Sequence, residues 1–275
     1  MVSVLILTYN EEGNIADCLD SVAWADDVLV LDSGSDDCTV EIAESKGART
    51  MHRTFDNFAR QRNYGLKEGD LEHDWVLHLD ADERVTPTLR EKLQEKARHG
   101  AKHAYRVPSK LMFQDTWLKY SGMYPTYQVR FGRRNVLTFE QVGHGQRSAL
   151  PDDRVGTIDE PLLHYAFSKG VADWVERHNR YSTDEAEHAL GANGDAVDWA
   201  ALVGDNPQAR RRAFKDLSYR LPFRPLLRFL YVYVGRLGFL DGRPGFDYAL
   251  LLSFYEYLIG LKRRELVRRG KGKAE

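Results

Sequence analysis

The chain has 275 residues, of which 43% are hydrophobic and 29% charged, so it can form one sizeable domain and a smaller second region. Its formal net charge of -2 argues against a nucleic-acid binder, because neutralising phosphates needs a clear basic excess. The two cysteines, Cys18 and Cys38, lack metal-ligand spacing, and we expect both to be buried free thiols, which suits a reducing compartment. The chain opens on an apolar run without a charged leader, which predicts a cytoplasmic location.

Short apolar runs alternate with helix-period segments over about the first 110 residues. Predicted strands are Val2–Leu7, Val28–Leu31, Trp75–Leu79 and a weaker Arg49–His52; predicted helices are Glu11–Val22, Thr39–Lys46, Asn57–Lys67 and Thr86–His99. This alternation predicts an α/β fold with a mostly parallel sheet and flanking helices.

The second half of the chain changes character twice. The stretch from Ala104 to His164 is irregular and β-like, and from Ser168 helical patterns dominate, including Val171–Leu190 and Gln208–Tyr219. We therefore predict a catalytic domain over residues 1–168 and a helical C-terminal region over residues 169–275.

Two apolar segments near the C-terminus, Leu226–Leu240 and Tyr248–Leu261, contain charged residues, and seven Lys or Arg residues follow them. Both segments are shorter than the roughly 20 residues that span a bilayer. Apolar helices edged by basic residues are typical of an interfacial membrane anchor, and each basic residue would add about 1 kcal/mol near an anionic leaflet. The alternative, compatible with the first, is a helix pair packed on the catalytic domain with a solvated basic tail.

Polar motifs follow three of the predicted strands, at the edge where parallel sheets bind ligands. They are TYNEE from Thr8, DSGSDD from Asp32 and DADE from Asp80. In the last motif Asp80 and Asp82 would project to one side if strand geometry persists, and such carboxylates suit Mg²⁺ or Mn²⁺ together with a nucleotide. The alternative, a surface turn that caps the helix near Thr86, explains only one of the acids.

Two further motifs have ordinary alternatives. Asp32 ends an apolar run, where its carboxylate could accept a hydrogen bond from a base or ribose, whereas Asp36 and Asp37 read as helix caps. Arg62, in FARQRN, could reach a phosphate or base, or could belong to a salt-bridged surface helix.

Together, TYNEE, DSGSDD, FARQRN and LDADERV resemble glycosyltransferase family 2, and most closely the bacterial branch that includes lipopolysaccharide-core glucosyltransferases. The resemblance continues through QVRFGRR, LLHYAF and GFLDGRPGF and so covers most of the chain. It implies a GT-A fold, a nucleoside-diphosphate sugar donor that is usually UDP-linked, and inversion at the anomeric centre.

The resemblance also implies roles for individual residues. Donor contacts would come from Thr8, Asn10 and Glu12 in the first loop, Asp32 at the uracil, Arg62 with Asn63, and Asp80. Asp82 would bind the divalent cation directly, and His164 would be an additional metal or diphosphate contact.

One departure concerns the general base, which must take the proton of the acceptor hydroxyl. A His-Glu pair often fills this position in the resembling enzymes, but this chain reads FEQVGHGQRS, with no acid after His144. Glu140 as a carboxylate or His144 as an imidazole could serve, and strand parity puts both on one face.

The resulting hypothesis is an inverting hexosyltransferase of envelope biosynthesis, on the cytoplasmic face of the inner membrane, whose acceptor is a glycolipid or polysaccharide close to the membrane. One alternative is a sugar-1-phosphate nucleotidyltransferase, but such enzymes need a basic Gly-rich first loop and LTYNEEGN is acidic. A second alternative is a non-catalytic nucleotide-sugar-binding or membrane-scaffold protein, which the absent His-Glu pair would allow.

Overall fold

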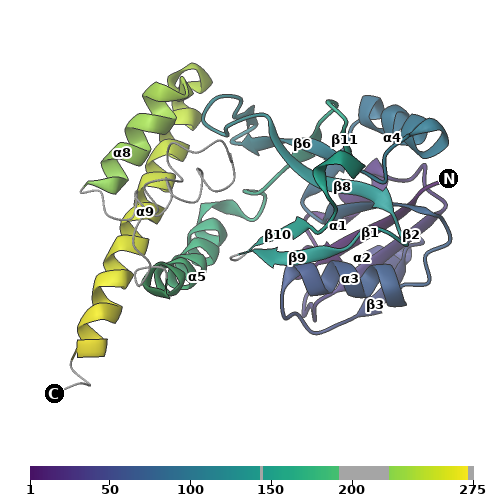
Figure 1. Ribbon diagram of the computed structural model, residues 1–275, viewed down its shortest axis with the longest axis horizontal. Helices are drawn as coiled ribbons and strands as arrows, with labels where there is room; N and C mark the ends of the chain where they lie inside the picture. Colours follow the sequence, from purple (N-terminus) through teal and green to yellow (C-terminus); the bar gives the residue numbers. More distant parts are fainter. Residues whose placement is uncertain (143–144, 192–222, 272–275) are drawn as a thin grey trace. The chain divides into compact units, whose positions relative to one another are not determined.

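A computed structural model describes residues 1–142, 145–191 and 223–271 (Figure 1). Contacts between residues divide the chain into two compact units, Met1–Gly170 and Val171–Glu275.

The first unit contains most of the strands. Its elements are β1 Ser3–Thr8, α1 Ile15–Ser21, β2 Asp27–Asp32, α2 Thr39–Ser45, β3 Arg49–His52, α3 Phe58–Glu68, β4 Trp75–Asp80, β5 Glu83–Val85, α4 Pro87–His99, β6 Ala104–Phe113, β7 Thr116–Trp117, β8 Thr126–Arg133, β9 Phe139–Val142, β10 Gly145–Ser148, the 3₁₀ turn η1 Asp152–Arg154, β11 Val155–Thr157 and β12 Leu162–His164.

The main sheet formed by these residues has the order β3-β2-β1-β4-β8-β6-β12-β5. Strands β3, β2, β1 and β4 are parallel, whereas β8 is inserted antiparallel between β4 and β6. Strands β9 and β10 form a separate hairpin. The predicted α/β class, with helices flanking a mostly parallel sheet, is confirmed for the first unit.

Predicted element boundaries agree with the structure where the sequence carries a cap. The Asn57 side chain accepts a hydrogen bond from Arg60 N and starts α3, and Thr86 Oγ1 does the same for α4, with Pro87 in its first turn. The helix predicted from Glu11 begins only at Ile15, because residues 11–14 form a turn. The three-residue strand β5 was not predicted.

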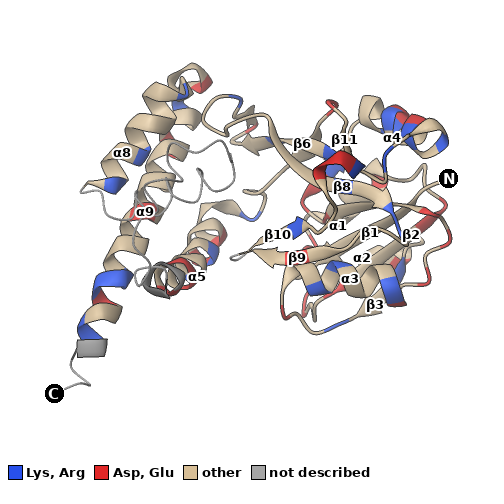
Figure 2. Cartoon of the chain, viewed as in Figure 1, with Lys and Arg blue, Asp and Glu red and all other residues tan. Residues whose placement is uncertain are grey.

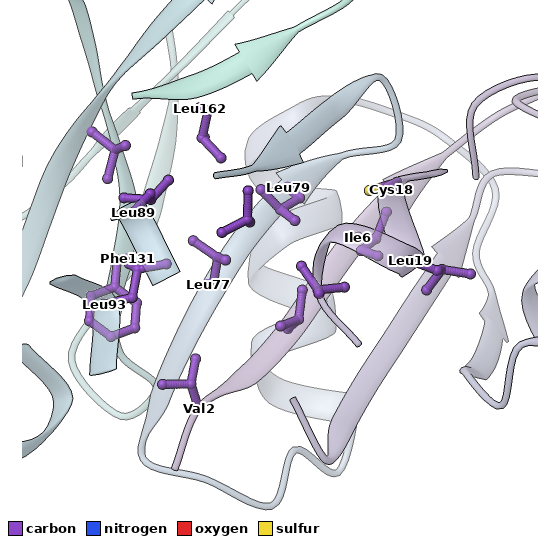
Figure 3. Packing of buried hydrophobic residues seen from close by; sticks show 14 of the residues in the cluster. Val2, Ile6, Cys18, Leu19, Leu77, Leu79, Leu89, Leu93, Phe131 and Leu162 are labelled. Carbon is purple, nitrogen blue, oxygen red and sulfur yellow. The ribbon is translucent and has the colours of Figure 1, made fainter. Parts of the chain in front are cut away.

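Two apolar clusters fill the two faces of the sheet. One contains Ile6, Leu77, Leu89, Phe131 and Leu162, under α1 and α4 (Figure 3). The other, which we call the α3-side cluster, joins β1, β2 and β4 to α3 and β9 through Leu5, Leu29, Ala59, Val76, Ala104 and Phe139. Strands β1, β2 and β4 are thus buried on both sides, which explains their continuous apolar sequences.

The second unit is helical in its described residues. It contains α5 Gly170–Gly191, α8 Arg224–Leu230, the π turn η3 Tyr231–Gly235, the 3₁₀ turn η4 Gly238–Asp241 and α9 Gly242–Lys271. The predicted helix Leu226–Leu240 is therefore interrupted, with Leu237 in the left-handed region at φ 61°. The predicted helix Gln208–Tyr219 lies outside the described residues. No helix within the described residues is both long and apolar enough to cross a membrane.

The prediction for the cysteines was right for one residue and wrong for the other. Cys18 is buried in α1 against the sheet, as expected. Cys38 is exposed, because it precedes α2 in the loop that follows β2 and points away from the core. Both are free thiols.

Candidate functional site

The predicted convergence of three strand ends is present. In the parallel pairing of β1 with its neighbours, Thr8 lies beside Asp32, and Leu7 lies beside Asp80. Backbone hydrogen bonds continue past the strand ends, from Ser33 N to the Thr8 carbonyl and from Ala81 N to that of Leu7. The three polar motifs therefore share one edge of the sheet.

The first loop is held by the second through side chains. Asn10 Nδ2 donates to Asp36 Oδ1 at 2.6 Å, and Asp36 N donates back to Asn10 Oδ1 at 2.9 Å. Glu12 joins the same loop, since its N–H donates to Asp37 Oδ2 and its carboxylate accepts from Cys38 N. Asn10 has a positive φ of 53°, which asparagine tolerates better than most residues. The two loops therefore form one platform.

Asp32 is almost fully buried and organises its own loop. One oxygen accepts from the N–H groups of Gly34 and Ser35, at 2.8 and 2.9 Å, and the other accepts from the Ser35 hydroxyl. Gly34 has φ +98°, a conformation that favours glycine. A donor contact by Asp32 stays a prediction.

Asp80 lies between two buried arginines. Arg62 Nη2 donates to Asp80 Oδ1 at 2.6 Å, and Arg130 Nη2 donates to Asp80 Oδ2 at 2.8 Å. Arg130 also bonds Glu83 at 2.8 Å, and the second oxygen of Glu83 accepts from Asp80 N. Burial raises the pKa of Asp80, but the two guanidinium groups outweigh it and lower that pKa. We call Arg62, Asp80, Glu83 and Arg130 the Asp80 network; its four formal charges cancel.

Arg130 owes its orientation to an irregularity in β8. Phe131 pairs with Tyr105 of β6, but the next residue of β6, Arg106, pairs with Val129. The residue of β8 between these two pairs therefore has no partner on β6. A bulge of this kind inserts an extra residue and redirects its side chain. Here the extra residue is Arg130, whose side chain is only 5% exposed.

Asp82 has a different partner. His164 Nε2 lies 3.3 Å from Asp82 Oδ2, and Tyr165 N donates to the Asp82 carbonyl at 2.8 Å. Burial lowers the pKa of His164, but the Asp82 carboxylate outweighs it and raises the pKa to about 9. Residues 82 and 164 are thus brought together, as the resemblance implied.

This pair fits a divalent cation that keeps phosphate and water ligands. Mg²⁺ and Mn²⁺ take one or two carboxylates from protein in nucleotide sites, and imidazole suits transition metals better than Mg²⁺. Among the described residues, no group of three or more His, Cys, Asp or Glu side chains could hold a metal ion. Asp82 and His164 would therefore supply two ligands at most, and the nitrogen ligand favours Mn²⁺.

Asn63 of α3 contacts the β9–β10 hairpin, which bears Glu140. Asn63 Nδ2 donates to the Phe139 carbonyl at 2.8 Å, and Phe139 N donates to Asn63 Oδ1 at 2.9 Å, so Asn63 fixes the start of β9. Glu140 is exposed on β9 and pairs in register with Arg147 of β10. His144, the other candidate base, lies outside the described residues.

A segment after β12 returns to the first loop, which the sequence did not indicate. Lys169 Nζ lies 2.6 Å from Glu11 Oε1 and 3.3 Å from the Tyr9 carbonyl. Asn14 Nδ2 donates to Ser168 Oγ at 2.7 Å. These contacts span more than 150 residues of sequence, and local patterns cannot reveal them.

Comparison with known proteins identifies the family. The model of the family described as glycosyl transferase family 2 matches residues 3–147, which carry all three strand-end motifs. The chain belongs to glycosyl transferase family 2. It is a glycosyltransferase, as the sequence predicted.

Relatives match over nearly the whole chain. An uncharacterized glycosyltransferase of Rickettsia prowazekii is 34% identical over 96% of this chain and 87% of its own. The lipopolysaccharide core biosynthesis glycosyltransferase LpsC of Rhizobium meliloti is 23% identical over 92% of this chain and 90% of its own. A crystal structure of glucosyl-3-phosphoglycerate synthase from Mycobacterium tuberculosis, in complex with Mn²⁺, UDP and glucosyl-3-phosphoglycerate, has a TM-score of 0.45 and 19% identity, covering 60% of this chain and 71% of that one.

Proposed function

We propose that this glycosyltransferase moves a hexose from a UDP-sugar to a saccharide or glycolipid acceptor at a membrane surface, with inversion. The observation that carries the proposal is the Asp82–His164 pair, at 3.3 Å, beside the edge where β1, β2 and β4 end. Family membership supports the transferase chemistry, and the relation to LpsC supports an acceptor of the lipopolysaccharide-core type.

Asp82 and His164 would hold the divalent cation, which when bound supplies Lewis-acid stabilisation to the departing diphosphate. The platform of residues 8–12 and 32–38, held together by bonds such as that from Asn10 to Asp36, would bind the nucleoside. Asp32 would contact the base and Asn10 the ribose. The Asp80 network keeps the floor of this site rigid and uncharged overall.

The acceptor hydroxyl must lose a proton as it attacks the anomeric carbon from the side opposite the diphosphate. Glu140 is exposed on β9 and can accept a proton, and the hairpin that bears it is attached to α3 through Asn63. Glu140 and His144 both stay candidates for the base.

The membrane contact rests on the second unit. Apolar side chains that are each 44–55% exposed gather in one short segment: Leu226, Leu227, Leu230, Tyr231, Val234, Leu237, Phe239 and Leu240. Arginines lie within and after this segment, and the end of α9 is strongly basic (Figure 2). Apolar side chains beside basic ones suit the interface of an anionic bilayer.

Donor turnover tests the catalytic proposal. With Mn²⁺ and UDP-glucose or another UDP-hexose, the wild type should release UDP, and Asp82→Ala should slow that release by about a hundredfold or more. Asp153→Ala, an exposed acid in η1, is the matched control and should release UDP at the wild-type rate. Electron paramagnetic resonance of Mn²⁺ with UDP gives a second readout; equal Mn²⁺ binding by Asp82→Ala and wild type would contradict the assignment.

Vesicle sedimentation tests the membrane contact separately. Phosphatidylglycerol vesicles should sediment the wild type more than phosphatidylcholine vesicles do, and Leu227→Glu should lose most of that binding. Phe55→Glu is the matched control, because Phe55 is 45% exposed, against 44% for Leu227, and lies in the first unit. Equal sedimentation of Leu227→Glu and wild type would rule out this surface.

A further inference from the structure

A cluster of aromatic and basic side chains lies on the hairpin of β6 and β7 and on the loop that follows it. Lys110 Nζ lies 4.3 Å from the centre of the Trp117 ring, and Lys119 Nζ lies 5.6 Å from the same centre. Tyr124 meets that ring edge-on, with 5.1 Å between ring centres. We call Lys110, Trp117, Lys119 and Tyr124 the indole–lysine cluster.

The sheet holds Lys110 against the indole. Strand β6 pairs with β7 so that Met112 lies opposite Trp117, and Lys110, two residues before Met112, projects to the same side. Lys110 is half-buried, and within the described part of the chain it has no carboxylate partner within 4.0 Å.

One residue of the candidate metal pair, His164, lies on the strand next to the one that bears Lys110. Strand β12 runs parallel to β6, with Leu163 beside Lys110 and His164 beside Leu111. Strand alternation therefore directs the His164 and Lys110 side chains to opposite faces of the sheet, from neighbouring strands about 5 Å apart.

Strand alternation gives the side of the sheet on which the cluster lies. On β4, Val76 packs in the α3-side cluster, and Asp80 shares its face; on β6, Ala104 packs in that same cluster, and Lys110 shares its face. The indole–lysine cluster and Asp80 therefore face the same side of the sheet.

We infer that the indole–lysine cluster is an acceptor subsite that binds an anionic group, phosphate or carboxylate, on a saccharide. The lysines provide the charge, and the Trp117 and Tyr124 rings provide an apolar surface against which a sugar ring packs. The inference rests on the proposed function, because it assigns the acceptor side of the same reaction.

Binding of simple sugars to the full chain tests this inference without any turnover. Ligand-observed NMR titrations with glucose 6-phosphate, glucuronate and glucose should give tighter binding for an anionic sugar than for glucose. Lys110→Met should weaken the binding of the anionic sugar about tenfold, the effect of one charge-assisted hydrogen bond. Lys110→Arg should retain most of it, and Lys67→Met, which removes an exposed lysine of α3, is the matched control.

The two anionic probes distinguish the sources of the charge, since tighter glucose 6-phosphate binding indicates a phosphate and tighter glucuronate binding a carboxylate. Glucose binding as tightly as both anionic sugars, or an unchanged affinity in a folded Lys110→Met protein, would overturn the inference. Failure of the proposed function would appear elsewhere, as UDP release or Mn²⁺ binding that does not depend on Asp82.

Discussion

Replacing Arg130 with methionine should destabilise the protein strongly, although no apolar contact is lost. Arg130 is the cation shared by Asp80 and Glu83, and Glu83 is completely buried. Removing one partner of a buried ion pair costs about 3–5 kcal/mol, because the remaining charge is left without compensation. Asp80 is 32% exposed and keeps Arg62, so the lower end of that range, about 3 kcal/mol, is expected.

Urea unfolding followed by circular dichroism measures this loss. With an m-value of about 3 kcal/mol/M for a chain of this size, 3 kcal/mol lowers the midpoint by about 1 M. Arg130→Lys keeps the charge but loses the planar fork that reaches two carboxylates, so its loss should be intermediate.

A double-mutant cycle tests the physical reason. Glu83→Gln removes the buried charge that Arg130 compensates, so Arg130→Met combined with Glu83→Gln should cost at least 1 kcal/mol less than the two single losses together. If the two losses simply add, the charges do not compensate each other, and our account of the Asp80 network is wrong.

Two further perturbations address the frame that carries the site. Burial raises the pKa of Asp27, but hydrogen bonds, that of Ser3 first, outweigh it and lower the pKa. The stabilisation from the Asp27 carboxylate is therefore present above about pH 4 and lost as pH falls through the native pKa. Asp27→Asn should cost roughly 2 kcal/mol at pH 7 in urea unfolding, and a difference from wild type that stays constant down to pH 3 would contradict this. Gly65→Ala puts a Cβ 2.5 Å from Leu5 Cδ2 and should cost about 1–3 kcal/mol in the same assay. Gly13→Ala is the control and should be nearly neutral, because a Cβ there would have open space around it. Equal effects of the two substitutions would mean that α3 and β1 do not pack as described.

The sequence predicted the edge of the sheet well, because that edge depends on local patterns. Apolar runs place the strands, and parallel pairing then brings Thr8 beside Asp32 and Leu7 beside Asp80 without any knowledge of distant contacts. Cap residues such as Asn57 place the helices for the same reason.

The partners of the acids could not be predicted, because they come from distant parts of the chain. Arg62 and Arg130 lie 18 and 50 residues from Asp80, and the orientation of Arg130 depends on a bulge with no sequence signature of its own. Arg62 was expected either at a ligand or in a surface salt bridge; it pairs with an acid, but inside the protein, at 1% exposure.

Asp80 and Asp82 also show where strand periodicity ceases to apply. Their expected common side required strand geometry to persist, but β4 ends at Asp80 and residues 81–82 form a turn before β5. Asp80 therefore meets Arg62 and Arg130, whereas Asp82 meets His164.

The chemistry of these partners separates the three carboxylates of the motif. A guanidinium group has donors only and cannot bind a metal, so Asp80 and Glu83 are each held by a group that a cation could only repel. An imidazole nitrogen can donate to a carboxylate or bind a metal, so the Asp82–His164 pair alone, among the three acids and their described partners, can convert from a hydrogen-bonded pair to a pair of ligands. We therefore propose that the motif combines two acids that hold the fold rigid with one that binds the cation, and that the identity of each distant partner, more than the spacing of the acids, assigns these roles.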